Sequence, residues 1–226
     1  MKAIIVAAGK GTRMKHLTEK VPKPMLVVAG KNLIEHKLDA LPFSIKNIVI
    51  TVGYLGEKIK EYFGDNYGDK SITYIEELTL QGTGYSVHVS RDHLKDERFL
   101  YMMGDDIYHK DDIDEALKYP WAMVVARKNG PVSGGRVFLN DDGTVKNIVE
   151  GTHEGEEILL NIGLFVVGKE IFNYELSKLP GRSEYGFPQQ FAQAAKDFPV
   201  KVIISKGWHA LSSPEDLERA NQTLGV

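Results

Sequence analysis

The chain has 226 residues, of which 42% are hydrophobic and 26% are charged, and it contains no cysteine. The absence of cysteine excludes a disulfide framework, a thiolate metal site and a cysteine nucleophile. A formal net charge of −3 gives no basic field for general nucleic-acid binding, and no apolar stretch approaches the ~20 residues of a membrane span. The first apolar run, Ala3–Ala8, is too short for a signal peptide. We therefore expect one cytoplasmic globular domain that binds neither nucleic acid nor membrane.

Strands and helices alternate along most of the chain. Lys2–Ala7 is a continuous apolar run that ends at glycines, which is typical of a buried strand leading into a loop. Leu33–Leu41 has helical apolar spacing behind an Asn32 cap. By the same criteria we expect strands at Ile48–Val52, Ile72–Glu76, Phe99–Met103, Trp121–Ala126 and Val200–Ser205, and helices at Leu55–Phe63, Gly84–Leu94, Asp111–Leu117, Phe187–Ala195 and Pro214–Thr223.

The middle of the chain breaks this alternation. Arg136–Leu139 and Val145–Glu150 flank an Asn-Asp-Asp-Gly turn, which indicates a hairpin, and Ile158–Val167 follows as another strand. No linker-like segment separates the halves of the chain. The pattern predicts one α/β domain (1–226) with a mixed, mostly parallel sheet, helices on both faces and a small antiparallel insertion.

The strongest motif follows the first strand and reads Ala7-Ala8-Gly9-Lys10-Gly11-Thr12-Arg13-Met14. Glycines carry no Cβ, so backbone N–H groups in the loop can approach phosphate oxygens, and Arg13 can add a charge-assisted contact. The Walker spacing is absent, and a dinucleotide fingerprint would need glycine where Met14 stands. The loop therefore predicts a phosphate cradle, with Ala7, Ala8, Gly9, Gly11, Thr12 and Arg13 as nucleotide-binding residues.

A second motif, Val21-Pro22-Lys23-Pro24-Met25-Leu26, follows within a dozen residues. The two prolines restrict the backbone on either side of Lys23, so its ammonium group projects from a stiff segment. A stiffly held lysine near a phosphate loop predicts stabilisation of charge at phosphorus. We expect Arg13 and Lys23 to be catalytic.

Together the two motifs resemble the sugar-1-phosphate nucleotidylyltransferase family, whose signature is a G-x-G-T-R-[LM] loop followed by a P-K-P segment. The resemblance implies a three-layer, Rossmann-like domain, with a nucleotide-binding half at about 1–130 and a sugar-binding half at about 131–226. It also implies the reaction: an NTP and a sugar 1-phosphate give a nucleotide-diphospho-sugar and pyrophosphate. The expected partners are these small molecules, while the oligomeric state stays open and a homo-oligomer is compatible with the sequence.

The resemblance extends to the base site. Gln81-Gly82-Thr83-Gly84-Tyr85 resembles the family stretch L-G-T-[AG]-x-A, which implies that Gly82 and Thr83 bind the nucleotide. Glu77 stands where many relatives carry a base-reading glutamine. A carboxylate can accept N–H donors such as those of guanine or cytosine, and related uridylyltransferases also carry glutamate there, so the base stays open.

Met102-Met103-Gly104-Asp105-Asp106 follows a predicted strand and resembles the family's G-D motif. The resemblance implies that Asp105 binds the catalytic Mg²⁺, and a carboxylate at the C-terminal end of a parallel strand suits that role. Asp106 would point the opposite way if the strand continued, so we expect it to be solvated or to act as a cap.

On the sugar side, Gly135, Glu150 and Asn161 align with family positions at the sugar, and the resemblance implies that Glu150 and Asn161 bind its hydroxyl groups. Two departures stand out. Gly151 replaces the usual lysine of an E-K-P segment, and Ala210 stands where the second metal-binding aspartate is often found. His209, Ser212 or water could complete a Mg²⁺ sphere instead.

The implied reaction needs no protein nucleophile, because a sugar phosphate is largely ionised at pH 7, its second pKa being ~6. Three other hypotheses stay open: a cytidylyltransferase acting on a phosphorylated alcohol, a glycosyltransferase using Gly104-Asp105-Asp106 as a metal motif, and a non-catalytic nucleotide or nucleotide-sugar sensor of the same fold. The glycosyltransferase reading leaves Lys23 between two prolines unexplained, and the sensor reading is motivated by Gly151 and Ala210.

Overall fold

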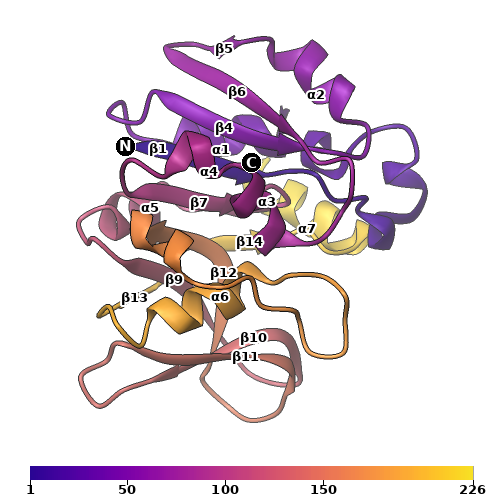
Figure 1. Cartoon of the computed structure of the whole chain (residues 1–226). Coiled ribbons are helices and arrows are strands. Elements are labelled where there is room, and N and C mark those ends of the chain that lie inside the picture. Colours follow the sequence, from indigo (N-terminus) through magenta and orange to yellow (C-terminus); the bar gives the residue numbers. More distant parts are fainter. Residues whose placement is uncertain (226) are drawn as a thin grey trace.

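One ten-stranded sheet organises the chain in the computed structural model, which describes residues 1–225 (Figure 1). Eight strands follow the order β11-β10-β12-β7-β1-β4-β6-β5, and β9 pairs with β12 and with β13. Their bounds are β1 Lys2–Val6, β4 Asn47–Val52, β5 Asn66–Tyr67, β6 Lys70–Glu76, β7 Phe99–Met103, β9 Ala122–Lys128, β10 Val132–Leu139, β11 Val145–His153, β12 Ile158–Val167 and β13 Lys201–Ile204.

The sheet is mixed and mostly parallel, as expected. β1 pairs in parallel with β4 and β7, and β4 does so with β6. β12 lies antiparallel to β7, β9 and β10, and β10 in turn forms an antiparallel hairpin with β11 at the edge of the sheet. Strands β5, β11 and β12 therefore run against the other seven, and the predicted antiparallel insertion is confirmed.

Helices cover both faces of the sheet, because successive strand residues point to opposite sides. Ile5 and Ile50 pack into a core with α1 (Leu33–Ala40), α2 (Gly56–Phe63) and α5 (Lys110–Ala116). Ile4 and Val49 pack into the other core with α3 (Thr83–Val89), α4 (Arg91–Leu94) and α6 (Phe187–Ala194). The three-layer prediction is confirmed.

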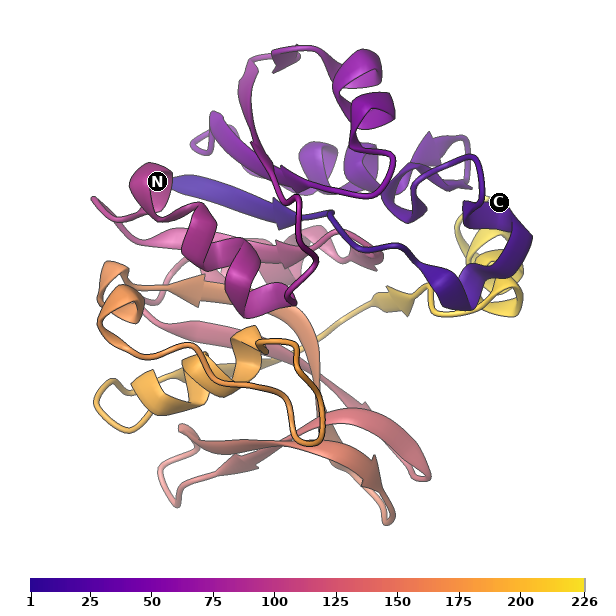
Figure 2. The same cartoon turned by 45° about the vertical axis from the view of Figure 1, so that its right-hand side comes forward.

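A smaller layer brings the segment after β1 next to the last helix of the chain. The ribbon β14 (Trp208–Ala210) pairs with β8 (Asp106–Tyr108), and α7 (Pro214–Leu224) lies beside the 3₁₀ segment η1 (Thr12–Thr18) (Figure 2). Leu211 and Ala220 share a core with Leu33 and Ile107. The remaining elements are β2 Val27–Val28, β3 Lys31–Asn32, η2 Lys23–Met25 and η3 Lys169–Asn173.

Most predicted elements occur within a few residues of their expected bounds, with two informative differences. The expected helix over 84–94 is two helices, broken at Ser90, whose hydroxyl donates to the Ser86 carbonyl. A polar side chain that bonds back to its own helix competes with the regular backbone pattern. The hairpin strands β10 and β11 are longer than expected, because the added residues include Gly134, Gly135 and Gly151, and glycine gives no strand signal.

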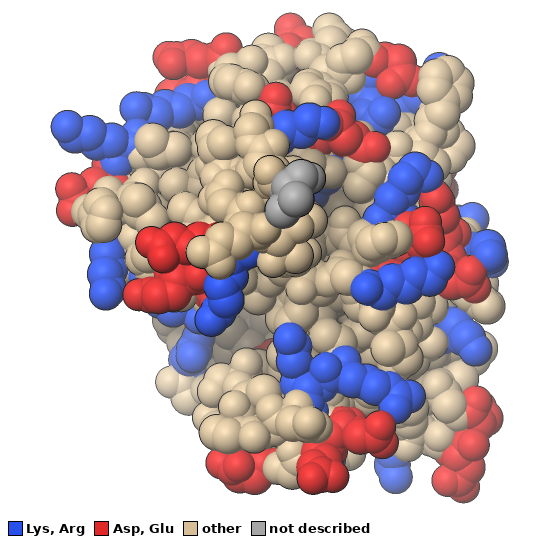
Figure 3. All heavy atoms as spheres, turned by 180° about the vertical axis from the view of Figure 1, so that it is seen from behind, with Lys and Arg blue, Asp and Glu red and all other residues tan. Residues whose placement is uncertain are grey.

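The surface carries charges of both signs (Figure 3), and the helices are short. Acidic and basic side chains are interspersed over the face shown in Figure 3 rather than gathered by sign. Within residues 1–225, no helix combines the length and the apolar character needed to cross a membrane.

Candidate active site

The loops that follow β1, β4, β6 and β7 meet at one edge of the sheet. The strands are parallel and in register, with Val6 opposite both Thr51 and Met103, so the loops emerge side by side. Ligands bind at this carboxyl edge in open α/β sheets. A cleft of about 990 Å³ opens there. Its lining includes Ala7, Ala8, Gly9, Lys10, Gly11, Thr12, Arg13, Lys23, Tyr54, Glu77, Leu80, Gly82, Thr83, Ser86, Met103, Asp105, Arg182 and Glu184.

Hydrogen bonds to the neighbouring strand fix the start of the glycine loop. Ala7 N donates to the Thr51 carbonyl at 3.1 Å, and the Ala8 carbonyl accepts from Tyr54 N at 3.1 Å. Gly11 has φ of 64°, and a Cβ there would lie 2.8 Å from Lys23 Cβ. The position therefore needs glycine for its backbone angle and for the close approach of the lysine.

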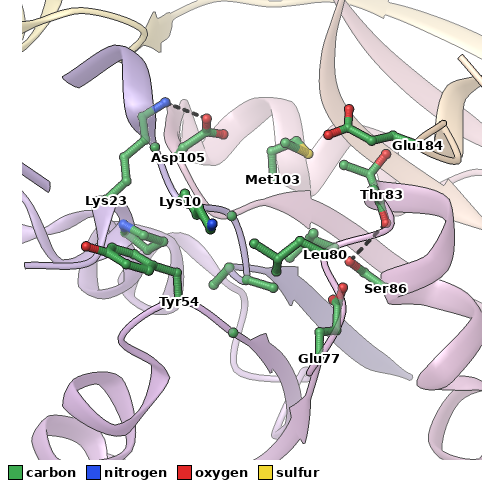
Figure 4. A pocket seen from close by; sticks show the side chains of 18 of the residues that line it. Lys10, Lys23, Tyr54, Glu77, Leu80, Thr83, Ser86, Met103, Asp105 and Glu184 are labelled. Atoms are coloured by element: carbon green, nitrogen blue, oxygen red, sulfur yellow. Dashed lines mark hydrogen bonds and ion pairs between the residues drawn. The ribbon is translucent and has the colours of Figure 1, made fainter. Parts of the chain in front are cut away.

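Lys23 begins the 3₁₀ turn η2 after the extended Pro22, so the two prolines hold it as expected. The residue is only 5% exposed, yet it lines the cleft. Its Nζ lies 2.6 Å from Asp105 Oδ2, and Figure 4 shows the two side chains meeting across the cleft. The sequence predicted both residues separately but not this ion pair.

The two adjacent aspartates differ in environment. Burial would raise the pKa of Asp105, but the charge of Lys23 and its hydrogen bond bring that pKa below its ordinary value. Burial, followed by the charge of Asp105, raises the pKa of Asp106 to about 7. The prediction that Asp106 is solvated or a cap is wrong. The residue starts β8 and is half-buried, because the chain turns directly into a second strand.

Glu77 lies at the end of β6 and points into the cleft (Figure 4). It is 5% exposed, and within residues 1–225 its Oε1 has no hydrogen-bond partner. Burial raises the pKa of its carboxyl group. A buried polar atom without a partner, aimed into a cleft, is a candidate ligand contact.

The loop that contains Gln81, Gly82 and Thr83 is hydrogen-bonded to the segment at the start of α6. Tyr185 N donates to the Gln81 carbonyl at 2.7 Å, and Thr83 Oγ1 accepts from Phe187 N at 3.0 Å. A Cβ on Gly82, whose φ is 96°, would lie 2.5 Å from the Tyr185 carbonyl oxygen. Gly82 is therefore needed where two loops cross, and Thr83 serves the same junction.

This junction brings to the cleft two charged residues that the sequence reading missed. Arg182 and Glu184 precede α6 and line the cleft, about 170 residues away from the glycine loop in sequence. Lys10 also lines it, although the sequence predicts no role for it. Their common signal is a charged residue within two positions of a glycine in a loop, which is too frequent to single them out.

Gly135, Glu150 and Asn161 come together on β10, β11 and β12. Gly135 pairs with Glu150, and a Cβ on Gly135 would lie 2.9 Å from Glu150 Oε1 and 3.4 Å from Asn161 Cβ. The three are not among the residues lining the cleft. They adjoin the cleft through Gly163, which lies two residues after Asn161 on β12. A Cβ added to Gly163 would lie 2.3 Å from Cγ of Met103, a residue that lines the cleft. Their role at a sugar stays a prediction.

The positions that depart from the family pattern also have defined places. Ala210 lies opposite Asp106 in the β8–β14 ribbon, and His209 is opposite Ile107. Ser212 N donates to Asp216 Oδ2 at 2.9 Å. Gly151, at φ of 158°, pairs with Gly134 in the hairpin. None of the four lines the described cleft.

The donor set in the cleft fits a hard cation only in part. Asp105 is 27% exposed and offers carboxylate oxygen, the ligand that Mg²⁺ prefers. Among residues 1–225 no group of three His, Asp or Glu side chains could hold a metal ion alone. Mg²⁺ commonly keeps water and uses one or two carboxylates together with substrate phosphates. The residues therefore fit a cation that arrives with a phosphate ligand.

Comparisons with known proteins agree on one family. A family model described as nucleotidyl transferase matches residues 2–225. The bifunctional protein GlmU of Methanocaldococcus jannaschii is 34% identical over 226 residues, which cover 99% of this chain and 54% of that protein. The UTP--glucose-1-phosphate uridylyltransferase AglF of Haloferax volcanii is 28% identical, with 99% and 96% covered. The chain thus spans about half the length of the first curated relatives it matches.

The fold is shared with a crystal structure of a putative glucose-1-phosphate thymidylyltransferase from Bacillus anthracis in complex with a sucrose. The TM-score is 0.86 at 21% identity, and the match covers 100% of this chain and 95% of that one. At that identity the likeness establishes a common architecture.

Proposed function

The chain belongs to the nucleotidyl transferase family, and on that basis we propose that it transfers a nucleotidyl group from an NTP to a sugar 1-phosphate. The products are a nucleotide-diphospho-sugar and pyrophosphate. The observation that carries the proposal is the meeting of Lys23 and Asp105 at 2.6 Å in a cleft lined by the glycine loop. The relative AglF, a UTP--glucose-1-phosphate uridylyltransferase, supports the same reaction class.

The reaction balances without a protein nucleophile or base. A phosphate oxygen of the sugar 1-phosphate forms a bond to the α-phosphorus, and the bond between that phosphorus and the bridging oxygen breaks. Pyrophosphate departs with the electron pair. The attacking phosphate is already largely ionised at pH 7, because its second pKa is ~6. The protein has to align two anions and neutralise the charge that develops on the transferred group.

The residues of the cleft divide this work. The amides of the glycine loop and the side chain of Arg13 hold the polyphosphate, and Lys23 neutralises charge near the α-phosphorus. Gly82 and Thr83 shape the base site, and Glu77 reads the edge of the base. Gly135, Glu150 and Asn161, which adjoin the cleft without lining it, bind the sugar.

Asp105 would hold a Mg²⁺ ion that enters with the nucleotide. Such an ion, when bound, stabilises negative charge on the phosphates. Asp105 contributes a carboxylate with a lowered pKa, which keeps it ionised at neutral pH. The cytoplasm, where NTPs are available, suits this chemistry.

The test is pyrophosphate release measured across the four NTPs and dTTP, each with glucose, N-acetylglucosamine and mannose 1-phosphates and with phosphocholine, in the presence and absence of Mg²⁺. We expect Mg²⁺-dependent release with at least one sugar 1-phosphate. Release with phosphocholine but with none of the sugar 1-phosphates would indicate a cytidylyltransferase that acts on a phosphorylated alcohol. If the protein binds nucleotide but releases pyrophosphate from no pair of NTP and acceptor, the proposed transferase activity is overturned in favour of a non-catalytic sensor.

A further inference from the structure

A buried lysine lies directly behind the loop that carries Asp105. Lys37 belongs to α1 and is 1% exposed. Its Nζ donates to the carbonyl oxygens of Leu33 at 3.1 Å, of Gly104 at 3.1 Å and of Asp106. These three acceptors match the three N–H donors of the ammonium group. Lys37 is thus a fully hydrogen-bonded cation in the protein interior, and it is not among the residues lining the described cleft.

Two of the three acceptors lie on either side of Asp105 in the chain. The carbonyls of Gly104 and Asp106 both accept from Lys37, so the peptide unit before Asp105 and the peptide unit after Asp106 are held by the same side chain. Strand β1 holds the same loop, because Gly104 N donates to the Val6 carbonyl at 2.8 Å. A Cβ on Gly104 would lie 2.5 Å from that oxygen. The backbone at Asp105 therefore has a fixed course while its side chain faces the cleft.

We propose that Lys37 is a positioning residue, which fixes the backbone of the Asp105 loop through its hydrogen bonds and places its ammonium group behind Asp105 and Asp106. Burying a lysine is unfavourable unless its charge and its donors are satisfied. An apolar side chain would fill the same space without that penalty, but it would leave the two loop carbonyls without this partner. The placement therefore serves the Asp105 loop rather than the core alone.

The charge has a specific use at this position. Lys23 neutralises Asp105 from the cleft side, at 2.6 Å. A phosphate that draws Lys23 away would leave two adjacent carboxylates with less compensation. Lys37 cannot follow, since all its donors are bound to backbone on α1 and on the Asp105 loop. It therefore holds the loop in place while Lys23 exchanges partners.

This inference rests on the proposed function, because it assigns Asp105 to a metal that accompanies phosphate. The test compares wild type with Lys37→Met and with the control Lys70→Met. Lys70 is also a buried lysine, 8% exposed and paired with Asp69, but it lies at the start of β6 and away from the cleft. Three quantities are measured: the melting temperature, the binding of Mn²⁺ with pyrophosphate by water-proton relaxation, and kcat with KM for both substrates.

We expect Lys37→Met to weaken Mn²⁺ binding by about 10–100-fold and to lower kcat by a similar factor, the range seen when an outer-shell partner of a metal ligand is removed. KM for the sugar 1-phosphate should change less than threefold. Lys70→Met should lose thermal stability while metal binding and kcat stay within twofold of wild type. A Lys37→Met protein that loses only thermal stability would overturn the proposal.

A second variant covers a failure of Lys37→Met to fold. Lys37→Gln keeps two N–H donors but no charge, so it should retain the loop partly and bind Mn²⁺ with intermediate affinity. If neither variant folds while Lys70→Met does, Lys37 is a core residue and the proposal is overturned. The comparison of Mn²⁺ binding does not depend on turnover. If the wild-type protein releases no pyrophosphate, the proposed function is refuted, but the effect of Lys37 on metal binding can still be measured.

Discussion

Lys23 Nζ and Asp105 Oδ2 lie 2.6 Å apart, although the two residues are separated by 82 positions in the chain. One belongs to the proline-flanked turn and the other to the loop after β7. The two opposite charges neutralise each other in this structure. Neither side chain is fully open to solvent, since the lysine side chain is 7% exposed and the aspartate side chain 27%. A phosphate oxygen at Lys23 and a cation at Asp105 would both compete with this pair. Substrate binding therefore exchanges one ion pair for two new ones.

The first prediction concerns turnover. Lys23→Ala should lower kcat by at least ~100-fold, as expected for the loss of a charge that stabilises the transition state. Steady-state pyrophosphate release at saturating substrates measures it. Lys31→Ala is the control, because Lys31 is an exposed lysine paired with Asp39 outside the cleft, and it should leave kcat unchanged. Near-normal turnover of Lys23→Ala would argue against the assignment of Lys23.

The second prediction concerns stability. Because Lys23 is paired with Asp105, its removal should affect folding as well as turnover. Lys23→Met leaves a partly buried carboxylate with less compensation, and Asp105→Asn leaves a buried cation. A double-mutant cycle by urea denaturation should give a coupling free energy of about 0.5–3 kcal/mol between the two sites. Strictly additive losses would mean that the pair contributes nothing to folding.

Local motifs predicted the cleft better than they predicted its contacts. The glycine loop and Lys23 were predicted from backbone chemistry and the two prolines, and Asp105 from its resemblance to the family's G-D motif. All three line the cleft at the carboxyl edge of the parallel strands. The partner of Lys23 was not predictable, since two charges 82 residues apart meet only through the pairing of β1 with β7. Arg182 and Glu184 were missed for the same reason, because a long-range loop junction brings them in. The bend of Asp106 into β8 depends on pairing with β14, which no local pattern shows.

The third prediction concerns Arg182, the cleft cation that came only from the structure. Arg182→Ala should raise KM for at least one of the two anionic substrates by ~10-fold, the equivalent of one charge-assisted hydrogen bond. The change in kcat should be smaller. Lys178→Ala is the matched control, because Lys178 belongs to the same segment but stacks over the Tyr185 ring outside the cleft lining. Equal KM values for both variants and wild type would remove Arg182 from the site.

The fourth prediction concerns the glycine loop. Gly11→Ala should lower the free energy of unfolding by about 1–3 kcal/mol, the usual range for a side chain forced into a left-handed backbone conformation. The new Cβ would also press on Lys23 Cβ, so kcat should fall with stability. Gly9→Ala is the control for folding, because nothing lies within 4 Å of an added Cβ there. Equal stability losses at the two glycines would show that the conformation of Gly11 is not required.

The fifth prediction uses the raised pKa of Glu77. The pKa in the folded protein lies above the ordinary value of 4.5, so the ionised carboxylate disfavours folding at neutral pH, and that penalty disappears as pH falls through the folded pKa toward 4.5. Glu77→Gln removes the charge and should raise the melting temperature at pH 7.5 relative to wild type. The gain should shrink as pH approaches 4.5, which calorimetry at several pH values would measure. The same variant should change relative activity among NTPs, because an amide both donates and accepts where a carboxylate only accepts. A melting-temperature difference that does not vary with pH would show that Glu77 has the same pKa in the folded and unfolded chain.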